Sequence, residues 1–126
     1  MSVETAISPF EFAASVYEAC DSMDENRFAA FLTEDCTFVY ANAAPVNGRA
    51  ASSSYVKAFM DMVAGIRHEL LEVWQCSDVI IARVKVTYTR KDESILVVPA
   101  MTLWRMRGSE ISEYLIYVDV SLLFAN

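Results

Sequence analysis

One acidic residue in this sequence lies where an acid is not expected. Asp119 ends the segment YLIYVD, and its neighbours Tyr117, Val118 and Val120 are aromatic or β-branched, as is typical of strands. Aspartate is depleted in strands, and these neighbours give it no turn to initiate. We therefore interpret Asp119 either as a functional carboxylate or as an acid that only ends a strand.

Four other polar residues lie in segments with the character of strands. Arg83 and Lys85 alternate with apolar residues in IIARVKVTY, and Tyr40 and Asn42 are two residues apart in CTFVYAN. Alternate residues of a strand share a face, so inward-turned faces would place an acid, two cations, a phenol and an amide in one cavity. The alternation could also run the other way. For Arg83 and Lys85 alone the solvated face is favoured, because strand lysines are usually exposed.

Four further residues are candidates for contacting a ligand in such a cavity: Tyr17, His68, Trp104 and Tyr117. His68 is the only histidine, and for it a surface or packed strand position is favoured over catalysis. A single histidine excludes a histidine-rich metal centre, and the acidic residues form no EF-hand pattern. The chain also lacks the glycine-rich nucleotide motifs and the G-x-S-x-G nucleophile elbow. We therefore predict neither a metal nor a cofactor.

The charge and the apolar content limit the partners of the chain. Seventeen acidic and ten basic residues give a net charge of −7, which repels phosphate backbones and anionic lipid, so neither nucleic acid nor membrane is expected to bind. The hydrophobic share of 55% exceeds the ordinary 45–50%. This excess predicts a subunit interface, an apolar pocket, or both, and we expect a homodimer that binds a small apolar molecule.

The length and the N-terminal composition predict one soluble domain. A chain of 126 residues is in the usual size range for one core, so residues 1–126 are expected to form a single domain. The N-terminus has no basic region followed by an apolar core, and the longest nearly apolar run, 95–104, is too short to span a bilayer. A cytoplasmic location is therefore expected. The three cysteines suggest buried thiols rather than a disulfide framework.

Three helices are predicted in the first half of the chain. Ser8 can cap a helix that begins at Pro9, and apolar residues at helical spacing follow it up to Cys20. Asp24 is expected to cap a second, short helix. After the strand CTFVYAN, apolar residues from Tyr55 onward repeat at helical spacing until Gly65, which is expected to end the third helix.

The second half of the chain is predicted to consist of long strands. Segments 66–75, 79–90, 95–106 and 111–120 have β character and are joined by short polar connections, which force antiparallel neighbours. Helices followed by a meander indicate the α+β class. Strands this long in a small domain must twist and curl, so the sheet is expected to enclose a cavity that helices close at one end.

Nearly the whole chain resembles the SnoaL-like branch of the nuclear transport factor 2-like superfamily. The resemblance lies in the order of elements, in RHELLEVWQCSDVIIARVKVTYTRKD, and in SEISEYLIYVD followed by apolar residues. It implies a cone-shaped barrel, in which three N-terminal helices close a curled mixed or antiparallel sheet. The superfamily includes polyketide cyclases, a ketosteroid isomerase, dehydratases, epoxide hydrolases and binding subunits without catalysis.

One segment, FVYANAAPVNGR, resembles limonene-epoxide-hydrolase-like members, in which a tyrosine and an asparagine hold the attacking water. Tyr40 and Asn42 occupy those places, Arg83 matches the middle-strand arginine, and Asp119 matches the final aspartate. The middle-strand acid of those members is replaced here by Lys85.

The lysine changes the chemistry that the resemblance implies. An ammonium near Asp119 would lower the pKa of that carboxyl and make it a base rather than a proton donor. Arg83 and Lys85 would then stabilise developing negative charge, with Tyr40 and Asn42 orienting water or a substrate oxygen. This favours isomerisation or cyclisation of a small apolar oxygenated substrate, with epoxide hydrolysis as a subordinate version. The alternative is a non-catalytic dimeric ligand-binding or assembly module, in which Lys85 and Asp119 neutralise one another.

Overall fold

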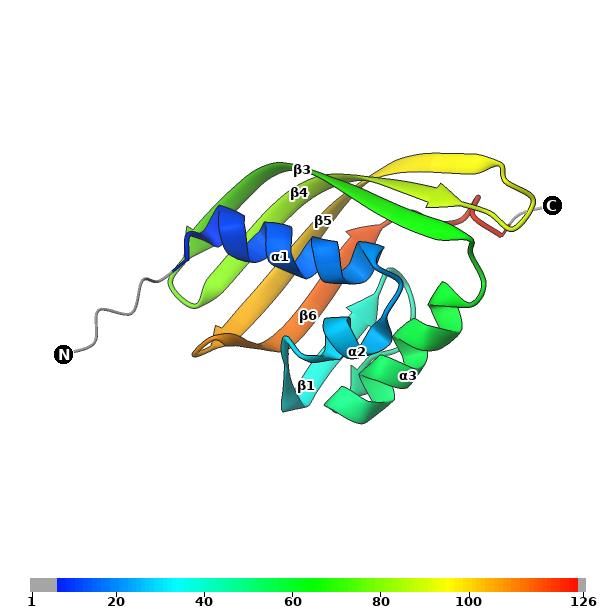
Figure 1. Cartoon of the computed structure of the whole chain (residues 1–126). Coiled ribbons are helices and arrows are strands. Elements are labelled where there is room, and N and C mark those ends of the chain that lie inside the picture. The colour runs from blue at the N-terminus through cyan, green and yellow to red at the C-terminus, as the bar shows by residue number, and fades with distance from the viewer. Residues whose placement is uncertain (1–6, 125–126) are drawn as a thin grey trace.

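The computed structural model describes residues 7–124 and shows three helices packed on one face of a curled sheet (Figure 1). The helices are α1 (Pro9–Asp21), α2 (Glu25–Ala29) and α3 (Arg49–Met60). The strands are β1 (Leu32–Tyr40), β2 (Val46–Asn47), β3 (Gly65–Cys76), β4 (Val79–Thr89), β5 (Ile95–Arg107) and β6 (Glu110–Val118). The α+β class, with helices before a meander, is confirmed.

The first helix begins where its sequence predicts. The Ser8 hydroxyl accepts the backbone N–H of Glu11 at 3.1 Å, and the Glu11 carboxylate accepts the backbone N–H of Ser8 at 3.3 Å. With Pro9 in the first turn, this capping box satisfies two N–H groups that the helix leaves open. The face that carries Phe12, Val16 and other apolar residues is buried, so the predicted inward stripe of α1 is confirmed.

The second helix follows its prediction and the third does not. Asp24 caps α2 by accepting the backbone N–H of Asn26 at 2.9 Å. By contrast, α3 begins at Arg49 and ends at Met60, whereas Gly65 is the first residue of β3. The predicted end at Gly65 is therefore wrong, because the chain leaves the helix in a turn that buries Val63.

The six strands form one mixed sheet in the order β2-β1-β6-β5-β4-β3. Strands β3 to β6 are an antiparallel meander, as their short connections predict. The first strand is parallel to β6, with Tyr40 opposite Ile116. The sheet does not close on itself; instead, α1 lies across its concave side and α2 and α3 lie beside β1, which gives the cone of the predicted fold (Figure 1).

The core lies between the helices and the concave face of the sheet. Inward residues alternate along β4, where Ile80, Ala82, Val84 and Val86 are all buried. Trp104 on β5 is fully buried among aromatic rings. Within the part of the chain that the structure describes, no helix has both the length and the apolar character needed to cross a bilayer.

The segment after β6 is tied back onto the end of β4. Leu123 is buried, and the Arg90 guanidinium donates to the backbone carbonyls of Leu122 and Leu123, each at 3.0 Å. Phe124 meets Phe59 of α3 edge to face, with ring centroids 6.1 Å apart. These contacts place residues 119–124 beside the open end of the cone.

Candidate functional site

A small aromatic-lined space, which we call the inner cavity, lies between the helices and the concave face of the sheet. Its volume is about 60 Å³, which is enough for a few water molecules. The residues around it are mostly apolar. The rings that line it are those of Tyr17, Phe28, Phe38, Tyr40, Tyr55, Phe59, His68, Tyr88 and Tyr114.

A larger and more open space, which we call the vestibule, lies at the mouth of the cone. Its volume is about 440 Å³, within the range of small-molecule sites. Asn42 and Asp119 line it together with apolar residues of α3 and of the C-terminal segment. Tyr40, Tyr55 and Phe59 line both spaces. These three rings therefore form a wall that the vestibule and the inner cavity share.

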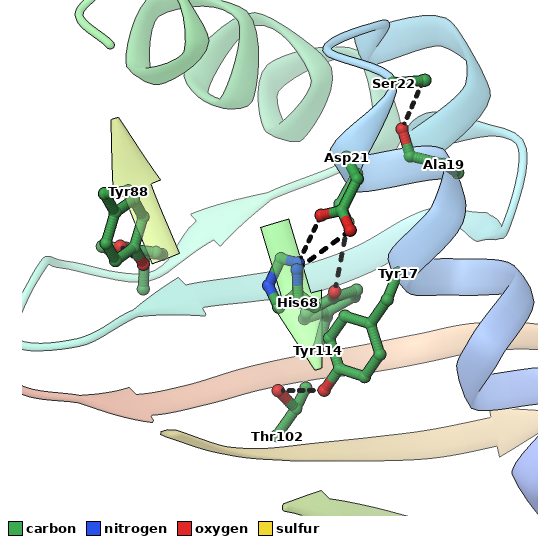
Figure 2. Close-up of polar contacts among 10 residues, drawn as sticks. Tyr17, Ala19, Asp21, Ser22, His68, Tyr88, Thr102 and Tyr114 are labelled. Atoms are coloured by element: carbon green, nitrogen blue, oxygen red, sulfur yellow. Dashed lines mark hydrogen bonds and ion pairs between the residues drawn. The ribbon is translucent and has the colours of Figure 1, made fainter. Parts of the chain in front are cut away.

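A histidine and an aspartate meet at the wall of the inner cavity. Asp21 is the last residue of α1, and its Oδ1 lies 2.6 Å from Nδ1 of His68 on β3 (Figure 2). The other carboxylate oxygen accepts the backbone N–H of His68 at 2.9 Å. The two side chains are only 14% and 26% exposed for His68 and Asp21 respectively, so the contact is sheltered from competing water.

This contact determines which nitrogen of the imidazole is available. An ionised carboxylate can only accept hydrogen bonds, so the neutral ring carries its proton on Nδ1 and presents the lone pair of Nε2. His68 lines the inner cavity, and among residues 7–124 no hydrogen bond reaches Nε2. Tyr17 stacks on the imidazole with centroids 4.4 Å apart and donates its own hydroxyl to Thr102 at 2.8 Å. The imidazole of His68 is thus held at Nδ1 by Asp21 and on one face by the ring of Tyr17.

Two phenols meet across the curl of the sheet. The hydroxyls of Tyr40 on β1 and Tyr88 on β4 are 2.6 Å apart, although two strands separate β1 from β4 in the sheet order. Burial raises the pKa of both phenols, so both are protonated at neutral pH. One hydroxyl donates to the other, which leaves one O–H available to a ligand. Tyr88 is also a diagonal neighbour of His68, which pairs with Val86.

A thiol in the same wall is not a nucleophile. The Sγ of Cys20 lies 3.8 Å from the hydroxyl of Tyr114. Burial raises the pKa of the Cys20 thiol to about 12, so almost no thiolate exists at neutral pH. We therefore assign no covalent chemistry to Cys20.

The sequence matches the SnoaL-like domain family over residues 13–114. The chain belongs to this family. No functionally curated protein matches it.

Solved structures of this SnoaL-like fold are similar to the chain over most of its length. A hypothetical protein with a ketosteroid isomerase-like fold from Catenulispora acidiphila, in complex with trimethylamine, is 22% identical, with a TM-score of 0.83 and coverage of 91% of this chain and 90% of that one. A candidate SnoaL-like polyketide cyclase from Jannaschia is 10% identical (TM-score 0.79, coverage 98% and 94%). An epoxide hydrolase of the limonene epoxide hydrolase-like type from M. tuberculosis is 11% identical (TM-score 0.77, coverage 92% and 86%). At these identities the likeness shows the fold.

The SnoaL-like domain does not bring Arg83 and Lys85 into either cavity. Both side chains are exposed on the outer face of β4, and Arg83 pairs there with Glu72, with 2.7 Å between guanidinium and carboxylate. Their assignment to the inside of the cone is therefore corrected. The physical reason is alternation: the neighbours Ala82 and Val84 face the core, so the cations must face solvent, as favoured for this pair alone.

Asp119 and Asn42 lie at the rim rather than inside. The last strand ends at Val118, and the exposed Asp119 carboxylate accepts the backbone N–H of Ser121 at 3.0 Å. This bond lowers the pKa of Asp119 below its usual value. Asn42 lies beyond β1, because Ala41, at a φ of 52°, turns the chain out of the strand. Lys85 does not reach Asp119 in the described structure, so the predicted neutralising pair is not formed.

Of the four predicted ligand contacts, two line the inner cavity and two do not. Tyr17 and His68 face it. Trp104 is fully buried in the core, with its ring centroid 5.4 Å from that of Tyr17, and lines neither space. Tyr117 is 61% exposed on the outer face of β6. The last two assignments are corrected, because the alternation of β5 and β6 directs Trp104 into the core and Tyr117 away from it.

Sequence reasoning missed Asp21, Tyr88 and Thr102. Asp21 follows Tyr17 by four residues, so it continues the inward stripe of α1 and could have been found by that spacing. Tyr88 shares the parity of the buried residues of β4, and Thr102 lies between the buried Ala100 and Trp104 on β5. Their partners could not have been found, since each bond joins residues far apart in the chain.

Proposed function

We propose that this SnoaL-like domain catalyses proton transfer at a carbon next to a carbonyl group, leading to isomerisation or cyclisation of a small, mostly apolar substrate. The observation that carries the proposal is the 2.6 Å contact between Asp21 Oδ1 and His68 Nδ1. It leaves Nε2 as a base on the wall of the inner cavity. The description of one similar structure as a candidate SnoaL-like polyketide cyclase supports this reaction class.

The chemistry follows from the positions of three groups. His68 Nε2 takes the proton from the carbon, and the electron pair moves into the carbonyl, whose oxygen becomes an enolate. The available hydroxyl of the Tyr40–Tyr88 pair donates to that oxygen. The imidazolium, stabilised by the Asp21 carboxylate, then returns the proton to another carbon. Alternatively, the carbanion attacks a second carbonyl and closes a ring, and the alkoxide formed from that carbonyl takes the proton from the imidazolium. No atom or electron is left over in either path.

The base in this scheme is His68 and not Asp119. Asp119 is exposed and bound to the N–H of Ser121, and it lies in the vestibule with Asn42. We assign these two residues to contact with the body of the substrate. We do not propose epoxide hydrolysis by the catalytic residues that the sequence suggested, because two of them, Arg83 and Lys85, lie outside the cone.

Steady-state turnover tests the proposal. Cyclic unsaturated ketones and epoxides are offered to wild type, His68→Gln, Asp21→Asn, Asp119→Asn and the outer-face control Arg83→Gln. Loss of a general base typically costs about 10²–10⁴-fold in rate, and we expect that loss for His68→Gln. Asp21→Asn should lower kcat more than it changes KM, since Asp21 only positions the ring. Added imidazole should restore part of the rate to His68→Gly. A His68→Gln variant as active as wild type would exclude the proposal.

A second candidate is a dimeric binding module without catalysis. It is supported by the inner cavity, whose volume of about 60 Å³ is below the range of about 300–1,000 Å³ for small-molecule sites. It is also supported by an apolar row across the outer sheet face, where Trp74, Ile81, Leu103 and Leu115 are successive register partners. A second copy of the chain could cover this face. Sedimentation at micromolar concentration should show a dimer that Ile81→Glu dissociates; a wild-type monomer would contradict it.

A further inference from the structure

The charged side chains at the vestibule and beside His68 are acidic. No lysine or arginine belongs to the described residues that line the inner cavity or the vestibule. Asp119 stands on the vestibule wall, and Asp21 stands behind His68. Among the described residues, the walls of the two spaces therefore offer a ligand one carboxylate, that of Asp119, and no lysine or arginine.

Two basic residues close to the vestibule in the structure or the sequence are engaged elsewhere. Arg90 donates to two backbone carbonyls of the C-terminal segment and also to Ser94. Lys57 is adjacent to a vestibule residue of α3, but its ammonium lies 3.3 Å from the Asp61 carboxylate. Neither cation lines the vestibule.

The remaining lining of the vestibule offers an anionic ligand few partners. The vestibule wall is built mostly from alanine, valine, methionine and phenylalanine side chains, and its few neutral polar side chains are those of Asn42, Ser121, Tyr40 and Tyr55. Moving a carboxylate or phosphate from water onto such a surface without a cation or a set of donors is strongly unfavourable. A neutral ring system has no charge to desolvate, and the burial of its apolar area favours its transfer from water into the vestibule.

We propose that the site selects an uncharged substrate, with its carbonyl end in the inner cavity and its apolar body in the vestibule, and that it rejects molecules bearing a carboxylate or phosphate. The orientation rests on the proposed function, since it assumes that the reacting carbonyl meets His68. The inner cavity, at about 60 Å³, is the smaller of the two spaces, and the vestibule, at about 440 Å³, is large enough for a bicyclic body.

A pair of matched probes tests the charge selection without any need for turnover. Binding of 2-naphthol and of 2-naphthoate is measured by calorimetry at neutral pH. We expect naphthol to bind at least about ten-fold more tightly than naphthoate. The test is sharpened by Ala58→Lys, which places an ammonium on the vestibule wall, and by Ala14→Lys, which makes the same change in net charge on the exposed face of α1.

The lysine in the vestibule should raise naphthoate affinity about ten-fold, and the lysine on α1 should leave it within about two-fold, because surface charges beyond a Debye length of about 8–10 Å are screened. Equal binding of the two probes to wild type would overturn the proposal, as would failure of naphthol to bind or equal effects of the two lysines. His68→Gln separates this proposal from the catalytic one. If His68→Gln loses turnover but still prefers naphthol to naphthoate, both the charge selection and the proposed reaction are supported. If His68→Gln keeps its turnover and its preference for naphthol, only the proposed reaction is refuted.

Discussion

The two carboxylate oxygens of Asp21 bind two different groups of His68: Oδ1 meets ring Nδ1 at 2.6 Å, and Oδ2 accepts the backbone N–H at 2.9 Å. Asp21 ends α1, and His68 lies in β3, which is an edge strand of the sheet. The contact that docks the helix on this strand therefore also determines the tautomer of the only histidine. Structure and proposed chemistry depend on the same carboxylate.

Asp21→Asn should lower the free energy of unfolding by about 1–3 kcal/mol, because a hydrogen bond to a charged group is worth roughly that amount and an amide cannot accept from both donors. Urea unfolding measures the change. Asp61→Asn is the control, since it removes only the exposed pair with Lys57 and should cost about 0.5 kcal/mol or less. Equal costs for the two variants would show that Asp21 does not hold His68 in solution.

The hydroxyl contact between Tyr40 and Tyr88 should appear as a coupling energy. In a double-mutant cycle with Tyr40→Phe and Tyr88→Phe we expect about 0.5–1.5 kcal/mol of coupling, the net value of one buried hydrogen bond. A matched cycle pairs Tyr40→Phe with Tyr17→Phe, whose hydroxyl has a different partner in Thr102, and should be additive within about 0.5 kcal/mol. Additivity in the first cycle would mean that the two phenols do not bond.

Alkaline pH should destabilise the fold. Burial raises the folded-state pKa of the phenols of Tyr17, Tyr40, Tyr88 and Tyr114 above the ordinary value of 10.0, and that of the Cys20 thiol from 9.0 to about 12. Between each ordinary value and the raised one, the unfolded chain loses the proton that the folded chain keeps. The stability that these groups contribute is therefore complete below about pH 9 and declines as the pH rises above it.

Urea unfolding at a series of pH values measures this decline, and phenolate absorbance follows the ionisation itself. The four buried phenols should ionise only as the protein unfolds. Full phenolate formation near pH 10 with no loss of folded structure would contradict the burial of these side chains.

Arg83→Gln and Lys85→Gln should leave turnover and ligand binding within about two-fold of wild type, because both side chains lie on the outer face of β4. Arg83→Gln should cost at most about 1 kcal/mol in stability, the usual value of an exposed ion pair such as the one with Glu72. A loss of activity of ten-fold or more, with unchanged stability, would place these residues back in the mechanism.

Hydrophobic periodicity was enough to predict most of the elements. The stripe on α1 and the four long strands are visible because apolar residues recur with the period of a helix or a strand. The start of α3 could not be predicted in this way, because its first turns, Arg49 to Ser54, carry small residues and no apolar stripe. Its end was placed too late, since a glycine that begins a strand was interpreted as a helix cap.

The site was less accessible than the fold because its contacts join distant parts of the chain. Asp21 meets His68 across 47 positions, and Tyr40 meets Tyr88 across 48. Strand alternation says which residues share a face but not which face is inside, so the charged residues of β4 were assigned to the cavity although its apolar residues occupy that side. Tyr88 and Thr102 lie at inward positions of their strands, where polar side chains are uncommon.

Proton abstraction by His68 is tested most directly by deuterium exchange into a cyclic ketone in D₂O, followed by proton NMR at the carbon next to the carbonyl. The account predicts catalysed exchange by wild type and by Asp119→Asn, and a rate at least about 100-fold lower for His68→Gln. Exchange that survives in His68→Gln and disappears in Asp119→Asn would contradict it and would make the carboxylate at the rim the base.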